Sequence, residues 1–259
     1  MTYNTFEKLV EHANNANRYL SFFVIAALFT AILPWTAWAH NPIAIDGGAT
    51  DAATAYKIPD VTVSHVAYHH AKDGQPFLWI TFDGKAGQEI NLQMGVPKLD
   101  RYASIRPATA LLGAGFPPVT TLPFPAPEGM GALILTTEGQ EPEVFHEEFT
   151  GTMDWMFKQE QVILPQDGTY FMVSYIPSGS EGKFWVAPGT REAFGLWDMI
   201  RMPAIIIKAR LFHEIFPWGG ILGWAYLALF VIVLVLMLLL VGLFFLLKRI
   251  FLKTHKANL

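Results

Sequence analysis

A continuous apolar run near the C-terminus limits what this chain can be. Residues 219–247 read GGILGWAYLALFVIVLVLMLLLVGLFFLL and contain no charged residue, proline or side-chain amide. A helix needs about 20 apolar residues to cross the hydrocarbon core of a bilayer. Soluble proteins seldom build a helix that is apolar on every face at this length. The run therefore predicts a transmembrane helix over residues 218–247.

The flanks of this run predict its orientation. Trp218, Trp224 and Tyr226 cluster at its start, and amphipathic rings of this kind favour the headgroup region of a membrane. A basic tail follows over residues 248–259, and positive charge is retained on the cytoplasmic side. We therefore expect a cytoplasmic C-terminus at the cell membrane. The main part of the chain should then lie on the extracytoplasmic side, periplasmic or extracellular.

A second apolar run, residues 20–39, precedes the main part of the chain. It ends in the triplet AWA, which is typical of a signal-peptide cleavage site. Residues 1–39 are thus predicted to be a signal peptide, and cleavage would leave His40 at the N-terminus. The alternative is an uncleaved signal anchor, because 20 uncharged residues are also enough to span a bilayer. Both alternatives place residues 40–215 outside the cytoplasm.

Charge is unevenly distributed along the chain. Residues 40–215 carry 12 Lys or Arg and 20 Asp or Glu, which gives a net charge of −8, whereas residues 248–259 carry +4. Phosphate binding needs clustered basic side chains, so nucleic acid is excluded as a partner of the acidic part. The chain has no cysteine, which excludes thiol catalysis and thiolate metal sites.

Alternating apolar and polar residues predict β-strands between residues 61 and 189. The segments VTVSHVAY, FLWITFDG, EINLQMGVP and TYFMVSY show this alternation, and turn residues separate them. The stretch from residue 113 to residue 131 is rich in proline and glycine, which indicates a loop. We therefore predict a mostly β chain whose main domain is an antiparallel β-sandwich over residues 61–189. A linker over residues 40–60 should precede it.

The apolar spacing becomes helical after residue 189. Apolar residues recur near helical spacing on both sides of Pro203, which predicts a broken amphipathic segment over residues 190–217. Two locations fit this pattern equally well. The segment could lie at the outer membrane interface as a juxtamembrane helix, or it could pack on the sandwich.

The closing strands of the predicted sandwich resemble a known domain. The stretch LPQDGTYFMVSYIPSGSEGKFWVAPG, residues 164–189, is similar to the end of bacterial pre-peptidase C-terminal (PPC) domains, which carry an LPadGtY signature. Earlier segments, including PATALLGAGFP and FHEEFTGT, resemble an uncharacterised group of membrane-anchored proteins with a related domain. The resemblance covers about residues 60–195. It implies a β-sandwich and assigns no catalytic residue.

Four histidines form a candidate metal site. His65, His69 and His70 lie close together in a predicted strand and turn, with His65 and His69 on one face. Cleavage after residue 39 would add the amine and imidazole of His40. Cu(II) prefers nitrogen ligands, so copper is the metal that such a set would suit. We expect instead that these are ordinary histidines of a hairpin, and that the chain binds no metal and no cofactor.

Two carboxylate groupings have equally simple alternatives. Several glutamates surround His146 and would suit Ca²⁺, but no EF-hand spacing is present, which favours a solvated acidic loop. Asp154 and Glu160, with Trp155 and Trp185 as sugar platforms, would suit a glycoside hydrolase. The motifs of serine hydrolases, zinc proteases and nucleotide-binding loops are missing from the sequence, so we expect no enzymatic activity.

Together these features predict a membrane-anchored recognition or assembly module outside the cytoplasm. Such a module would be an accessory subunit of an envelope or membrane complex. Its expected partners are the lipid bilayer and other membrane or envelope proteins. The alternative function is that of a periplasmic copper-binding protein that uses His40 together with His65, His69 and His70.

Overall fold

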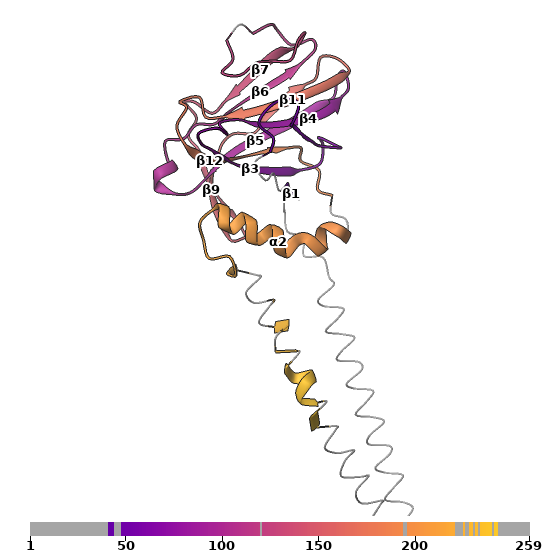
Figure 1. The fold of residues 1–259 in the computed structure, drawn as a ribbon, viewed down its shortest axis with the longest axis vertical. Coiled ribbons are helices and arrows are strands. Elements are labelled where there is room, and N and C mark those ends of the chain that lie inside the picture. Colours follow the sequence, from indigo (N-terminus) through magenta and orange to yellow (C-terminus); the bar gives the residue numbers. More distant parts are fainter. Residues whose placement is uncertain are drawn as a thin grey trace, which may run out of the picture. The chain divides into compact units, whose positions relative to one another are not determined.

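Two stacked β-sheets make up most of the described chain (Figure 1). The computed structural model describes residues 41–43, 48–119, 121–193 and 196–220, together with isolated positions between residues 225 and 242. The chain divides into two compact units, Met1–Trp38 and Ala39–Leu259, and the sheets belong to the second. The prediction of a mostly β sandwich is therefore confirmed.

The larger sheet has seven strands in the order β1-β3-β12-β5-β9-β8, with β10 also paired to β5. These strands are β1 (Asn41–Ile43), β3 (His65–Ala71), β5 (Glu89–Pro97), β8 (Glu143–Glu147), β9 (Thr152–Met156), β10 (Glu160–Ile163) and β12 (Gly182–Pro188). A 3-10 turn, η1 (Asp100–Tyr102), follows β5.

The smaller sheet has five strands in the order β2-β4-β11-β6-β7. They are β2 (Tyr56–Lys57), β4 (Leu78–Gly84), β6 (Ala108–Gly113), β7 (Gly131–Thr136) and β11 (Gly168–Tyr175). Pairing is antiparallel within both sheets except at one edge of each, where β1 lies parallel to β3 and β2 lies parallel to β4.

Both parallel edge strands come from the segment for which the sequence predicts a linker. Little periodicity marks residues 40–60, yet Ile43 and Ile58 are only 6% and 1% exposed. Burial of these two apolar side chains, together with that of Ala49, holds the segment against the sandwich. The antiparallel prediction is thus right for the interior of the sheets and needs correction at their edges.

Side-chain alternation along the strands separates two apolar regions. Leu78, Ile80 and Phe82 of β4 face the core between the sheets, together with Met172 of β11. Trp79 points to the opposite face of the smaller sheet, where a second apolar cluster has formed. Successive side chains on a strand alternate between faces, so one sheet that is apolar on both sides must be covered on both.

Tyr170 connects the core to the turn before β11. Its ring stacks on Phe82 at 5.6 Å between centroids, and its hydroxyl donates to the Gln166 carbonyl at 2.6 Å and accepts from the Gln166 N–H at 3.2 Å. A β-carbon at Gly113 would collide with this ring, so the neighbouring strand β6 needs a glycine at that position. The LPQDGTY part of the PPC-like signature therefore builds a hydrogen-bonded corner.

Helix α2 (Leu196–Phe212) packs on the sandwich through one side. Ile206 and Ala209 are 3% and 0% exposed, whereas Leu211 is 55% exposed. The helix continues through Pro203, so the break predicted at that proline is not seen. Of the two predicted locations for this segment, its described part takes the one against the sandwich.

No helix among the described residues has both the length and the apolar character that a membrane span requires. The predicted N-terminal run over residues 20–39 lies outside those residues, and so does about half of the predicted span over residues 218–247. Both spans remain predictions.

We expect Tyr170→Phe to keep the core filled and to lower the free energy of unfolding by about 1 kcal/mol, since a net hydrogen bond contributes roughly that amount. The midpoint of thermal unfolding should fall by about 2–4 °C for a domain of this size. Near-ultraviolet circular dichroism would measure the change. Tyr56→Phe, at an exposed tyrosine of β2, is the matched control, and an equal shift in both variants would contradict the role given to the Tyr170 hydroxyl.

Candidate functional site

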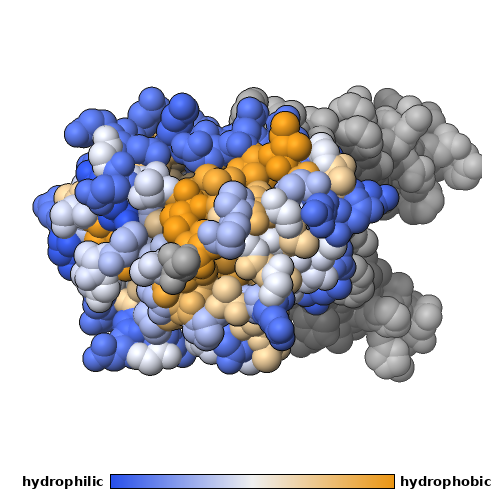
Figure 2. Space-filling view, turned by 90° about the horizontal axis from the view of Figure 1, so that it is seen from above, coloured by the Kyte–Doolittle hydropathy of each residue, from blue (hydrophilic) through white to orange (hydrophobic). Residues whose placement is uncertain are grey.

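An apolar hollow of about 450 Å³ opens over the outer face of the smaller sheet. Three segments line it: residues 50–53, Phe77 and Trp79 at the start of β4, and residues 124–127. We call it the aromatic pocket. Its volume lies within the range of roughly 300–1,000 Å³ that is usual for ligand pockets. Figure 2 shows a band of apolar side chains crossing the face of the molecule on the side of β6 and β7.

Aromatic rings form the floor and one wall of the aromatic pocket. Phe124 packs edge-on against both Phe77 and Trp79, at 5.2 Å between ring centroids in each case, and against Tyr175 at 5.8 Å. Phe124 comes from the proline-rich stretch for which the sequence predicts a loop, and it is 7% exposed. The loop thus covers the apolar outer face of the sheet and leaves the aromatic pocket beside its own prolines.

The indole N–H of Trp79 makes no hydrogen bond within the described part of the chain. Its side chain is 1% exposed, and the indole Nε1 has no hydrogen-bond partner among the described residues. The Trp79 ring packs edge-on against the rings of Phe124 and Phe171. A buried donor without an acceptor costs about 1–3 kcal/mol, so it is an uncommon feature.

A turn of residues 49–54 forms the opposite wall of the aromatic pocket. The Trp79 backbone N–H donates to the Ala49 carbonyl at 2.9 Å, which fixes this turn to β4. Asp51 Oδ1 accepts from the Thr54 N–H at 2.8 Å and from the Thr54 hydroxyl at 2.7 Å. These hydrogen bonds hold the pKa of Asp51 below its usual value, so the rim carries a negative charge at neutral pH.

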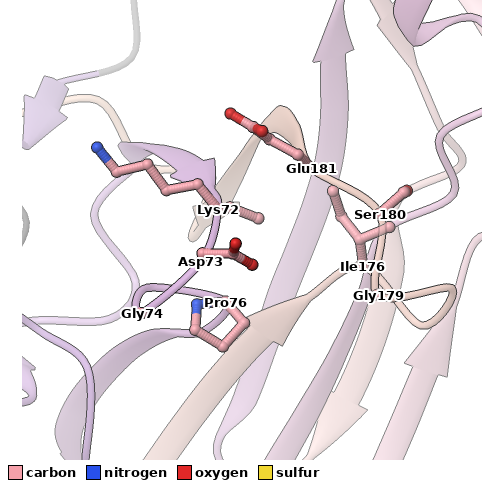
Figure 3. A pocket seen from close by; sticks show the side chains of 9 residues that line it. Lys72, Asp73, Gly74, Pro76, Ile176, Gly179, Ser180 and Glu181 are labelled. Atoms are coloured by element: carbon pink, nitrogen blue, oxygen red, sulfur yellow. The ribbon is translucent and has the colours of Figure 1, made fainter.

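A smaller, polar hollow of about 130 Å³ lies at one end of the sandwich. Figure 3 shows Lys72, Asp73 and Pro76 on one side of it and Ile176 and Ser180 on the other. Charged side chains and short turns line this hollow, and its lining residues include no aromatic ring, in contrast to the aromatic pocket. The aromatic pocket is therefore the stronger candidate for binding.

A buried polar network fastens α2 to the outer face of the larger sheet. Asp154 of β9 is 4% exposed, and its Oδ1 lies 2.8 Å from Trp185 Nε1 and 2.9 Å from His213 Nε2. His213 Nδ1 lies 2.7 Å from the Ala209 carbonyl oxygen. His213 therefore bridges the Asp154 carboxyl group and the last turn of α2 through its two ring nitrogens.

The turn that follows α2 adds three charged contacts. Glu214 has a φ of 59°, a left-handed conformation that is typical of the position after a helix. Its carboxylate binds Arg101 and Lys183, and hydrogen bonds from these two groups lower the pKa of Glu214 to about 2. Lys183 Nζ also donates to the last carbonyl of the helix, that of Phe212, at 2.8 Å.

Arg210 also links the end of α2 to the sandwich and to the segment that follows the helix. Its side chain is largely buried, and it donates to the Phe216 carbonyl at 2.7 Å and to the Thr150 carbonyl. Nearby, burial raises the pKa of Glu147, and burial followed by the charges of Asp154 and Glu147 raises the pKa of the Tyr68 hydroxyl. The junction is a packed, charged interface between helix and sheet.

The structure describes three of the four predicted copper ligands. His65 and His69 share one face of β3 and His70 lies on the other, as the sequence predicts. His69 Nε2 lies 3.0 Å from the Gln75 carbonyl oxygen, and His70 Nε2 lies 3.1 Å from Glu181. His40 lies outside the described residues. Within the described part of the chain, no three His, Asp or Glu side chains are placed to hold a metal ion. The copper site stays a prediction.

Two of the carboxylates identified in the sequence, Asp154 and Glu147, make hydrogen bonds within the fold. Asp154 contacts Trp185 directly, and Trp185 is itself 4% exposed, which leaves little ring surface for a sugar. Glu147 accepts from the Phe149 N–H at 3.0 Å at the end of β8. The pairing of Asp154 with His213 is not visible in the sequence, because 59 residues separate the two.

His69 should make stability depend on pH. Burial lowers the pKa of His69 to about 4, against about 6.5 in an unfolded chain. Between these values the unfolded state binds a proton that the folded state does not, so stability falls as the pH is lowered from about 6.5 to 4. The loss should be on the order of 1–3 kcal/mol. His69→Gln should flatten thermal unfolding midpoints across this window. His146→Gln, at an exposed histidine, should keep the wild-type slope, and equal slopes in all three proteins would contradict this assignment.

His213→Ala should release α2 from the sheet. It leaves the buried Asp154 carboxyl group with one partner fewer, and an unsatisfied buried polar group costs about 1–3 kcal/mol. We expect rapid tryptic cleavage after the exposed Arg201 and Lys208, measured by mass spectrometry. Leu211→Ala, at an exposed position of the same helix, is the control and should leave cleavage slow. A helix that stays protected in His213→Ala would show that the pair is dispensable.

Comparisons with known proteins return only distant likenesses to solved structures. No family model matches the chain, and no curated protein matches it. Among solved structures, the PPC domain of collagenase from Bacillus anthracis matches with a TM-score of 0.28 and 10% identity over 52% of this chain and 93% of that one. The secreted copper-binding protein MopE of Methylococcus capsulatus matches with a TM-score of 0.22 and 11% identity over 57% of this chain and 83% of that one. The predicted resemblance to PPC-type β-sandwiches is confirmed, and likenesses this distant carry no argument about function.

Proposed function

We propose that this chain is a recognition or assembly module that a membrane anchor holds outside the cytoplasm, as an accessory subunit of an envelope or membrane complex. The observation that carries the proposal is the aromatic pocket. It places Phe77, Trp79 and Phe124 around one hollow on the outer face of the smaller sheet, although Trp79 and Phe124 themselves are only 1% and 7% exposed. Concave apolar sites with few polar groups are typical of binding sites.

The polar groups around the aromatic pocket favour binding over chemistry. Its one ionised side chain, Asp51, is held by hydrogen bonds from Thr54. The lining residues, all of them described, include no histidine, serine or lysine that could act as a base or nucleophile. We therefore propose a binding module without enzymatic activity.

The junction at α2 supports the anchoring part of the proposal. The helix is fastened to the larger sheet through His213 and Arg210, and the predicted membrane span begins a few residues later. A sandwich attached in this way would be presented at a defined orientation to whatever lies beside it in the membrane. Copper binding through His40 remains the alternative, and no contact among the described residues favours it.

Two measurements on the full-length chain test the proposal. Protease added to intact spheroplasts should degrade residues 60–200 and spare the basic tail, because the sandwich is predicted to lie outside. Gentle purification from native membranes in lipid nanodiscs should then yield a second membrane or envelope protein in a fixed ratio to this chain. A sandwich that is protected from protease, or a chain that always purifies alone, would overturn the proposal.

A further inference from the structure

We propose that the side of α2 that faces away from the sandwich lies on the surface of a membrane that contains anionic phospholipids. The inference rests on the membrane anchoring in the proposed function and adds a second contact between the domain and the same bilayer. Three observations carry it: an exposed stripe along α2, exposed apolar side chains just after the helix, and a local excess of basic charge.

The two sides of α2 have opposite environments. The sandwich lies along one side of the helix (Figure 1), where Ile206 and Ala209 are buried. Residues three and four apart lie on the same face of a helix. Exposed residues recur at these spacings on the other side, and we call them the outer stripe: Arg201, Ala204, Lys208 and Leu211.

The outer stripe ends among large exposed apolar side chains. Leu211 is 55% exposed, and Phe216 and Trp218, a few residues later, are 70% and 48% exposed. Exposed apolar side chains that occur together mark a surface that contacts another phase or molecule. The predicted membrane span begins at residue 218, and tryptophan favours the headgroup region of a bilayer. We therefore expect the membrane surface at this end of α2.

The charge of this region favours an anionic surface. Residues 196–215 carry a net charge of +1, whereas residues 40–195 carry −9. One of the two acidic residues of the helical region, Glu214, is bound by Arg101 and Lys183. Anionic headgroups attract basic residues close to the surface, and charges more than a Debye length away, about 8–10 Å, are largely screened.

A lipid surface suits the outer stripe better than a protein partner does. Basic and apolar side chains on one helical face are typical of helices that lie at a membrane interface. Lysine, in contrast, is depleted in interfaces between proteins. Neither of the two hollows described above is lined by residues of α2, so these hollows give a partner side chain no place to insert at the stripe.

Nitroxide labels at single cysteines test the contact, because the chain has no cysteine of its own. The full-length protein is held in nanodiscs of phosphatidylcholine mixed with phosphatidylglycerol, and the label is attached at Leu211→Cys. Val144→Cys is the matched control, since Val144 is also 55% exposed and lies on the opposite face of the larger sheet from Asp154. We expect the ratio of collisions with oxygen to collisions with a water-soluble nickel chelate to be severalfold higher at position 211.

Removal of charge from the outer stripe should weaken the contact. Arg201→Gln combined with Lys208→Gln should lower the ratio of docked to undocked protein about 5-fold for each basic residue lost. Nanodiscs of phosphatidylcholine alone should have a similar effect on the wild type. Lys57→Gln combined with Lys85→Gln removes the same charge beside the smaller sheet and should leave docking unchanged. Equal docking of the Arg201/Lys208 variant and the wild type would overturn the inference.

The accessibility of each label separates the possible failures. A label at position 211 that is as open to the nickel chelate as the label at position 144 would overturn the inference. A label shielded from both reagents would show a protein contact and would also overturn it. Leu238→Cys, within the predicted span, reports on the anchor. If its label lies in water, the anchoring itself fails; if it lies in the bilayer while position 211 lies in water, only the present inference fails.

Discussion

The Asp154 carboxyl group connects three parts of the described chain. One of its oxygens lies within hydrogen-bond distance of Trp185 on β12 and of His213 just after α2. It thereby joins β9, β12 and the turn after α2 in one buried contact. A carboxyl group with 4% exposure is costly to bury, and the hydrogen bonds with Trp185 and His213 offset that cost. Removal of either ring would leave this buried group with one partner fewer.

The smaller sheet depends on a different constraint, because it is apolar on both faces. One face packs into the core with Ile80 and Phe82, and the other carries Trp79 and Val173. Two irregular segments cover the outer face, and Phe124 provides most of the aromatic contact. The aromatic pocket is the space that this cover leaves.

Sequence patterns predicted the parts of the fold where alternation is strong. The segments that became β3, β4, β5 and β11 alternate clearly and lie inside their sheets. Strands β8 and β9 did not stand out, because they are short and their exposed positions hold both polar and apolar residues. The parallel edge strand β2 has only two residues and leaves no periodic signal.

The sites were harder to predict, because they depend on contacts between distant segments. His213 and Asp154 were both visible as single residues, but nothing in their spacing indicates that they pair. Trp79 reads as an ordinary strand residue until its neighbours show that the indole N–H has no acceptor among the described residues. Pro203 suggested a broken helix, although α2 continues through it, because only one helical hydrogen bond is lost and the packed face lies further along.

The Arg210 guanidinium gives this junction a mechanical property. It grips the carbonyl of Phe216 beyond the helix and that of Thr150 in the turn between β8 and β9, and a side chain at Gly219 would collide with it. These contacts tie residues 216–219 to the turn between β8 and β9. A tilt of residues 216–219 would therefore strain the hydrogen bond to Thr150, so the position of this short segment is coupled to that of the β8–β9 hairpin.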